Sequence, residues 1–178
     1  MEIIYILNIS TLLLFYFIKR VFFNEKYSHK WRKKSAVKVL KKLENLNEAQ
    51  IFTYLRKIDP FTLEELILTV LEKREDIKIE RNKKYTGDGG VDGRFYILEN
   101  NKKPLKCIIQ AKRYSSLINP KHLKEFANQI NQENAYLGFF IHTGKTSKNS
   151  FAFAKSVNNL EIISGRRLIK LIKFGALD

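Results

Sequence analysis

The sequence is poor in cysteine and in acidic residues, and both shortages restrict what the protein can be. Cys107 is the single cysteine among 178 residues, which excludes an intramolecular disulfide framework and suits a reducing compartment. We expect its thiol to be buried and inert. Asp and Glu number 18 against 33 Lys and Arg, giving a formal net charge of +15. This imbalance favours a polyanionic partner, either nucleic acid or an anionic membrane surface.

Other common sequence features are also missing. The chain has no internal repeat and no low-complexity segment, and its length gives room for one ordinary domain and a short extension. It does not begin like a cleaved signal peptide, because Glu2 precedes the first apolar run, Lys19-Arg20 follow it, and no small-residue cleavage site is present.

The longest uncharged run lies near the N-terminus, from Ile3 to Ile18. Continued as a helix to Phe23, it would span about 31 Å, close to the thickness of a bilayer core. We therefore predict that residues 1–23 form a transmembrane anchor, which contacts the membrane through residues 3–23. The alternative is a buried core helix or an interfacial helix. The basic cluster at 19–34 predicts that the chain beyond it stays in the cytoplasm, and we expect 24–58 to be a basic juxtamembrane segment and helical linker.

From residue 59 onward, helices and strands alternate after an antiparallel hairpin. Asp59-Pro60 is typical of a helix start, with an N-cap followed by proline at the first helical position. The expected strands are 77–82, 90–98, 105–112, 136–143 and 160–164, and the expected helices are 35–43, 48–57, 60–74, 120–132, 146–157 and 166–172. This order predicts an α/β fold with a mixed β-sheet flanked by helices.

The most informative fragment is Tyr85-TGDGGVDG-Arg94, followed by Cys107-IIQAK-Arg113. Four of the eight glycines fall within its first half, which indicates a shaped turn that runs into a strand. If 90–98 and 105–112 form a hairpin, opposite positions sum to about 202, so Asp92 faces Gln110 across the strands. Gln110 and Lys112 share one strand face because they are two residues apart. An acid, an amide and a lysine therefore converge, which predicts a metal-and-phosphate site.

Four fragments together carry a resemblance to a known family: GDGGVDG, IIQAKRY, Gly138-FFIHTG and Ile162-ISGRRLIKLI. From about Asp59 to Ile172 the chain resembles the catalytic domain of Mrr-type restriction endonucleases, a branch of the PD-(D/E)xK nuclease superfamily. The resemblance implies a restriction-endonuclease-like domain at 59–178. The sequence departs from the family in two places. The winged-helix domain that often precedes this catalytic domain is missing, and the family's Thr-Thr is here His142-Thr143.

The resemblance also implies roles for particular residues. Gln110-Ala111-Lys112 matches the family's QxK, and Asp92 matches its metal-binding aspartate. The family's helix pattern F-E-x-L falls on Leu63-Glu64-Glu65-Leu66, which implies Glu64, with Glu65 as the alternative; Asp88 is a weaker candidate. The implied catalytic set is thus Asp92, Gln110, Lys112 and Glu64.

The chemistry expected of this set is phosphodiester hydrolysis. Asp92, Gln110 and Glu64 would hold the metal, and hard oxygen ligands favour Mg²⁺, with Mn²⁺ as the alternative. Lys112 would orient the attacking water or stabilise the developing charge. His142 lies at a strand end, either as a polar terminus or as a substrate contact. The residues expected to bind DNA phosphates are Arg113, Lys145 and Lys148, although each also suits a solvated surface charge.

Together these features predict a membrane-anchored, metal-dependent DNA endonuclease in restriction or defence against foreign DNA. Its expected location is the bacterial inner membrane, single-pass, with the catalytic domain in the cytoplasm and DNA as the partner; a homodimer stays open. One alternative is a catalytically weak DNA-binding membrane tether, and another is a resolvase or repair nuclease of the same superfamily. The intact Asp92, Gln110 and Lys112 favour the enzyme over the tether.

Overall fold

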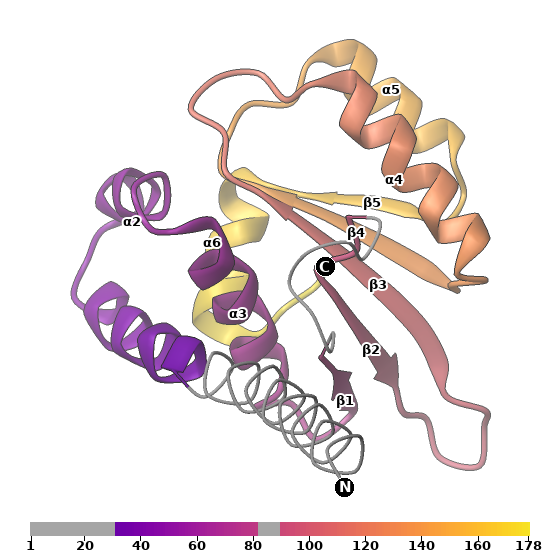
Figure 1. Ribbon diagram of the computed structural model, residues 1–178, viewed down its shortest axis with the longest axis horizontal. Helices are drawn as coiled ribbons and strands as arrows, with labels where there is room; N and C mark the ends of the chain where they lie inside the picture. Colours follow the sequence, from indigo (N-terminus) through magenta and orange to yellow (C-terminus); the bar gives the residue numbers. More distant parts are fainter. Residues whose placement is uncertain (1–30, 82–89) are drawn as a thin grey trace, which may run out of the picture.

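A five-stranded mixed sheet forms the centre of the molecule (Figure 1). The computed structural model describes residues 31–81 and 90–178. The strands lie in sequence order: β1 (Ile77–Glu80), β2 (Gly93–Ile97), β3 (Leu105–Lys112), β4 (Leu137–His142) and β5 (Leu160–Ile163). β1, β2 and β3 pair antiparallel, whereas β3, β4 and β5 pair parallel. The mixed sheet predicted from the sequence is confirmed.

The helices begin where local capping chemistry favours them. Asn47 forms a capping box with Gln50 ahead of α2 (Glu48–Leu55), and the Asp59 carboxylate accepts from Thr62 N–H at the start of α3 (Pro60–Leu71). The remaining helices are α4 (Pro120–Gln132), α5 (Lys148–Ser156) and α6 (Gly165–Phe174). Residues 31–44 are also helical, so the helix expected at 35–43 begins no later than residue 31.

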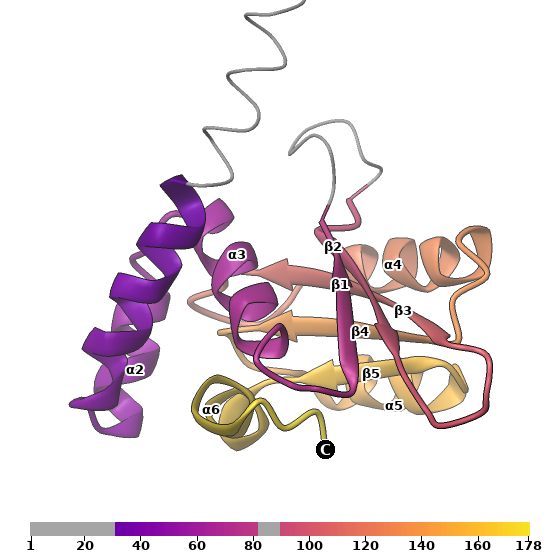
Figure 2. The same ribbon diagram turned by 90° about the horizontal axis from the view of Figure 1, so that it is seen from below.

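The helices cover both faces of the sheet, as Figures 1 and 2 show. α3 and α6 lie against one face, and α4 and α5 lie against the other. β4 is buried on both sides: Phe139 and Ile141 belong to the core beneath α3 and α6, while Phe140 belongs to the core beneath α4. This explains why the β4 segment is a continuous apolar run instead of an alternating one.

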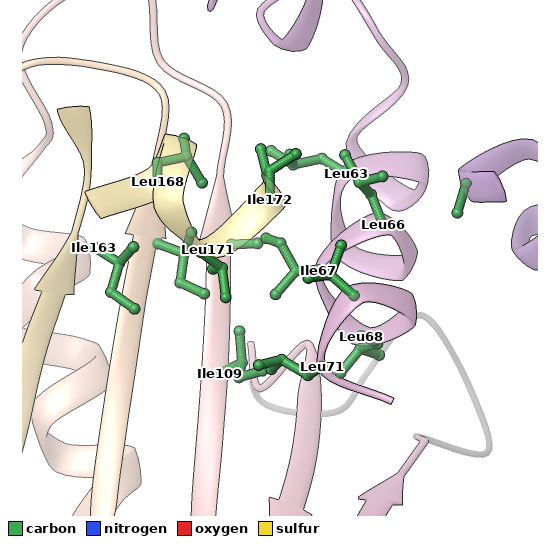
Figure 3. Packing of buried hydrophobic residues seen from close by; sticks show 14 of the residues in the cluster. Leu63, Leu66, Ile67, Leu68, Leu71, Ile109, Ile163, Leu168, Leu171 and Ile172 are labelled. Carbon is green, nitrogen blue, oxygen red and sulfur yellow. The ribbon is translucent and has the colours of Figure 1, made fainter. Parts of the chain in front are cut away.

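The larger core joins α3 and α6 to the sheet (Figure 3). Ile67 of α3 lies toward Leu171 of α6, and Leu71 of α3 lies beside Ile109 of β3. Side chains from 31–44 and from α2 are buried in this same cluster, namely Ala36, Val39, Leu40, Leu43, Ile51 and Leu55. The segment that we predicted as a helical linker is therefore packed, over these residues, onto the domain that contains the sheet.

The length and apolar content of the helices bear on the predicted membrane location. Across residues 31–81 and 90–178, none has the length and apolar content needed to cross a bilayer. This contradicts the predicted location in the bacterial inner membrane. The predicted anchor at 1–23, with its contact segment 3–23, lies outside the described residues.

Candidate active site

The β2–β3 hairpin has the register that its sequence predicts. Gly93 pairs with Ile109 and Ile97 pairs with Leu105. Asp92 N–H extends the ladder by one bond, donating to the Ile109 carbonyl at 2.8 Å. Asp92 therefore lies beside Gln110, at the end of the hairpin where β3 runs on toward Lys112.

The Asp92 carboxylate is held by one hydrogen bond and one ion pair from β3. Its side chain is 10% exposed, and Oδ2 accepts from the Ala111 N–H at 2.7 Å. Lys112 Nζ lies 3.7 Å from the same oxygen, with its side chain 33% exposed. The main chain fixes the position of the carboxylate, and the ammonium balances its charge at a place that solvent still reaches.

The Gln110 amide is buried and has a fixed orientation. Its side chain lies on the sheet face covered by α4, and its Nε2 donates to the Gly90 carbonyl at 2.6 Å. Gly90 adopts a φ of 89°, which favours glycine at this position. Gln110 Oε1 is buried and has no hydrogen-bond partner among residues 31–81 and 90–178. A buried amide oxygen without a donor suits a cation or an ordered water.

These oxygens fit a hard divalent cation. The Asp92 carboxylate supplies a negative charge, and Gln110 Oε1 supplies a neutral ligand of the kind that Mg²⁺ accepts. Over residues 31–81 and 90–178, no cluster of three or more His, Cys, Asp or Glu side chains forms a metal site. The predicted ligand set contains only two acids, so its donors include an amide.

Glu64 and Glu65 lie in different surroundings on α3. Glu65 is 1% exposed, and its Oε1 pairs with Arg81 Nε at 2.9 Å. Glu64 is half-buried and lies one turn before Leu68 on the same face of the helix. Leu68 packs so closely against β2 that a Cβ built on Gly93 would lie 2.6 Å from Leu68 Cδ2. Glu64 thus shares a helix face with the residue that packs against Gly93, the first residue of β2.

His142 is part of a buried polar network. Its side chain is fully buried, its Nδ1 accepts from the Gly144 N–H at 3.2 Å, and its Nε2 lies 3.0 Å from Thr146 Oγ1. Burial lowers the pKa of the His142 imidazole to about 4, because desolvation disfavours the charged ring. His142 is thus a neutral residue that ties the end of β4 to the following loop, as the polar-terminus alternative expects.

Some of the basic residues proposed from the sequence are engaged by the main chain. Arg113 Nη1 donates to the carbonyls of Arg56 and Ile58, at 3.3 and 2.9 Å. Arg56 in turn donates to the Thr143 carbonyl. These bonds attach the segment that leads into α3 to the ends of β3 and β4. The side chains of Lys145 and Lys148 are exposed beside the start of α5.

Two further predictions concern the Cys107 thiol and the Asp88 carboxylate. Cys107 is fully buried, and burial raises the pKa of its thiol to about 12, which agrees with an inert cysteine. Asp88 and the first part of the glycine turn, residues 82–89, lie outside the described residues.

Sequence reasoning missed Gln129 on α4, which lies beside Gly90. No local pattern separates it from Gln132 on the same helix, because only the contact with the distant hairpin distinguishes them.

Comparisons with known proteins find restriction endonucleases among the proteins similar to this chain. Residues 55–172 match the restriction endonuclease family Mrr_cat. The type IV methyl-directed restriction enzyme EcoKMrr of Escherichia coli strain K12 is 29% identical over 140 residues, covering 75% of this chain and 44% of that protein.

Two solved structures are also similar to the chain. The MspJI restriction endonuclease in complex with a 27-mer oligonucleotide has a TM-score of 0.49 and 18% identity, covering 71% of this chain and 32% of that one. The DNA modification-dependent restriction endonuclease AspBHI has a TM-score of 0.41 and 13% identity, covering 82% of this chain and 36% of that one. The chain spans less than half the length of each of these relatives.

Proposed function

The chain belongs to the restriction endonuclease family through residues 55–172, and from this membership we propose that it is a metal-dependent endodeoxyribonuclease that acts in restriction. One observation carries the proposal: Asp92, Gln110 and Lys112 meet at the end of the β2–β3 hairpin, inside the matched residues. The Gln110 amide oxygen there has no hydrogen-bond partner in the described part of the chain, which is the arrangement expected of a ligand.

The proposed substrate is double-stranded DNA that carries a base modification. The formal charge of +15 supports a nucleic-acid partner. The relative from Escherichia coli is described as methyl-directed, which makes methylated DNA the first substrate to test. Lys145 and Lys148 are the proposed phosphate contacts. Arg113 would contribute a further phosphate contact through guanidinium nitrogens other than Nη1, which donates to the Arg56 and Ile58 carbonyls.

Asp92, Gln110 and Glu64 are the proposed metal ligands, with Mg²⁺ as the expected ion and Mn²⁺ as its substitute. A divalent cation held there would supply an activated water and would polarise the phosphoryl oxygen. Glu64 is preferred to Glu65 as the metal ligand because the buried Glu65 carboxylate already forms an ion pair with Arg81. Glu64 also lies on the α3 face that continues toward Gly93 and Asp92.

Lys112 is the proposed electrostatic catalyst. In hydrolysis, water forms a new P–O bond while the bond to the leaving sugar oxygen breaks, and negative charge grows on the phosphate. An ammonium already fixed near the site stabilises that charge without having to reorganise. Asp92, 3.7 Å away, restricts where the Lys112 side chain can move.

A nicking assay with the full 178-residue chain tests the proposal. Supercoiled plasmid from methylating and non-methylating hosts is incubated with Mg²⁺, with Mn²⁺ or with chelator. We expect metal-dependent cleavage of the methylated plasmid and its loss in Asp92→Ala. A folded wild-type protein that leaves every plasmid intact with both metals would contradict the proposed activity.

A further inference from the structure

A second glutamine borders the site from the helix side. Gln129 is on α4, and its amide approaches the segment that leads into Asp92. A Cβ built on Gly90 would lie 2.9 Å from Gln110 Nε2 and 3.1 Å from Gln129 Nε2. Two amides from distant parts of the chain therefore meet at one glycine, two residues before the proposed metal-binding aspartate.

Both amides leave a buried oxygen without a partner. Gln110 Oε1 and Gln129 Oε1 are among the few buried side-chain atoms in the described residues that have no hydrogen bond. Buried amide oxygens in folded proteins nearly always accept a hydrogen bond or contact a cation or water. Two amides that approach the same glycine, each with an unpartnered oxygen, indicate a place that holds a cation and its water.

The position of Gln129 on α4 makes a purely structural role a poor explanation. The residues around it that face the sheet are apolar and buried, including Phe126, Ala127 and Ile130. An apolar residue would complete this face at no cost in polar desolvation, whereas a buried amide oxygen is unfavourable unless it is used. Its amide reaches past the apolar core to Gly90.

We propose that Gln129 is a positioning residue of the metal site, which accepts a hydrogen bond from a water of the cation's hydration shell through Oε1. This inference rests on the proposed function. Mg²⁺ keeps several of its waters when it binds to proteins, and groups that hold such waters fix the cation although they never touch it. The Gly90 carbonyl supports the arrangement by engaging Gln110 Nε2, so that Gln110 Oε1 is left for the cation.

Mn²⁺ binding to the full-length protein without DNA provides the test, because it does not depend on cleavage. The spin-resonance signal of free Mn²⁺ is titrated against wild type and variants. We expect Gln129→Leu to raise the dissociation constant roughly tenfold, and Gln129→Glu to lower it, because a carboxylate attracts the hydrated cation more strongly. Gln132→Leu is the matched control: it makes the same change at an exposed position of α4 and should bind Mn²⁺ like wild type.

The variants separate failure of this inference from failure of the proposed function. If wild type binds Mn²⁺ and Asp92→Ala does not, while Gln129→Leu and Gln129→Glu both bind like wild type, the role of Gln129 is wrong and the nuclease proposal stands. If wild type neither binds Mn²⁺ nor cleaves DNA with it, both are overturned. The Gln129→Glu arm keeps the test decisive if Gln129→Leu does not fold, because the substitution preserves side-chain size.

Discussion

At the scale of single residues, the neighbouring glutamates Glu64 and Glu65 have different surroundings although they are adjacent on α3. Successive positions on α3 point about 100° apart, so Glu65 is buried and pairs with Arg81, whereas Glu64 is half-buried on another side of the helix. Arg81 also binds Glu72, at 2.8 and 3.0 Å, and this bond lowers the pKa of the Glu72 carboxyl to about 2. The Glu65 carboxylate therefore belongs to an ion-pair network.

The same substitution at these two positions should give opposite results. Glu64→Gln should reduce the metal-dependent cleavage rate by at least about tenfold, because the site loses a negative charge, with little change in stability. Glu65→Gln should lower the free energy of unfolding by about 1–3 kcal/mol, because the Arg81 guanidinium loses a buried charged partner and keeps the more exposed Glu72. Urea denaturation and cleavage rates measure the two effects. The reverse ranking in activity would show that Glu65 is the ligand.

Lys112 gives a second residue-scale prediction. Lys112→Ala should slow cleavage by about 10²–10³-fold, because the growing phosphate charge loses a fixed ammonium. Mn²⁺ binding should persist, because Asp92 and Gln110 are unchanged. Lys103→Ala, an exposed lysine in the turn of the same hairpin, is the control. Wild-type cleavage by purified Lys112→Ala would remove Lys112 from the catalytic set.

His142 predicts a pH dependence of stability. Its pKa is lowered to about 4 in the folded protein, whereas an unfolded histidine titrates near pH 6.5. Between these values the unfolded chain binds more protons, so stability should fall as the pH drops from about 6.5 toward 4, by up to roughly 1.4 kcal/mol per pH unit.

Urea denaturation between pH 7 and 5 measures this slope, above the range where most carboxylates titrate. His142→Gln should flatten it, because an amide can replace both hydrogen bonds of the ring without titrating. His122→Gln, which loses the contact of its ring with Tyr114, should keep the slope. An unchanged slope in His142→Gln would assign the effect to other groups.

At the scale of elements, the helix at 31–44 is part of the folded domain. Leu43 is 2% exposed and belongs to the core of α3 and α6. Leu43→Ala should therefore reduce the free energy of unfolding by about 2–4 kcal/mol. Val37→Ala on the same helix should change it little, because Val37 is 40% exposed. Equal effects of the two substitutions on the urea midpoint would mean that the helix does not pack as described.

At the scale of the whole molecule, the excess of positive charge should govern how DNA binds. Binding to DNA should weaken steeply with salt, because each neutralised phosphate releases counterions. The double variant Lys145→Ala and Lys148→Ala should lower affinity for all sequences alike and reduce the salt slope by about 1–2. Fluorescence anisotropy over a salt series measures this, with Lys103→Ala as the control. An unchanged slope would place the phosphate contacts elsewhere.

The sequence by itself determined the elements and the hairpin. Caps such as Asp59-Pro60, the apolar run of β4 and the glycine turn act over a few residues, so their outcome is readable from local pattern. The pairing of Gly93 with Ile109 follows from the length of the turn, and it brought Asp92, Gln110 and Lys112 together as predicted.

Only the tertiary structure decided how the side chains are used. The free oxygen of Gln110, the approach of Gln129 to Gly90, the pairing of Glu65 with Arg81 and the carbonyl bonds of Arg113 each join segments far apart in the chain. The burial of Leu43 has the same origin, since its partners lie on α3 and α6. The local sequence pattern determines which face of its helix or strand a residue occupies. Which residue it contacts on that face is determined by the packing of elements that are distant in the sequence.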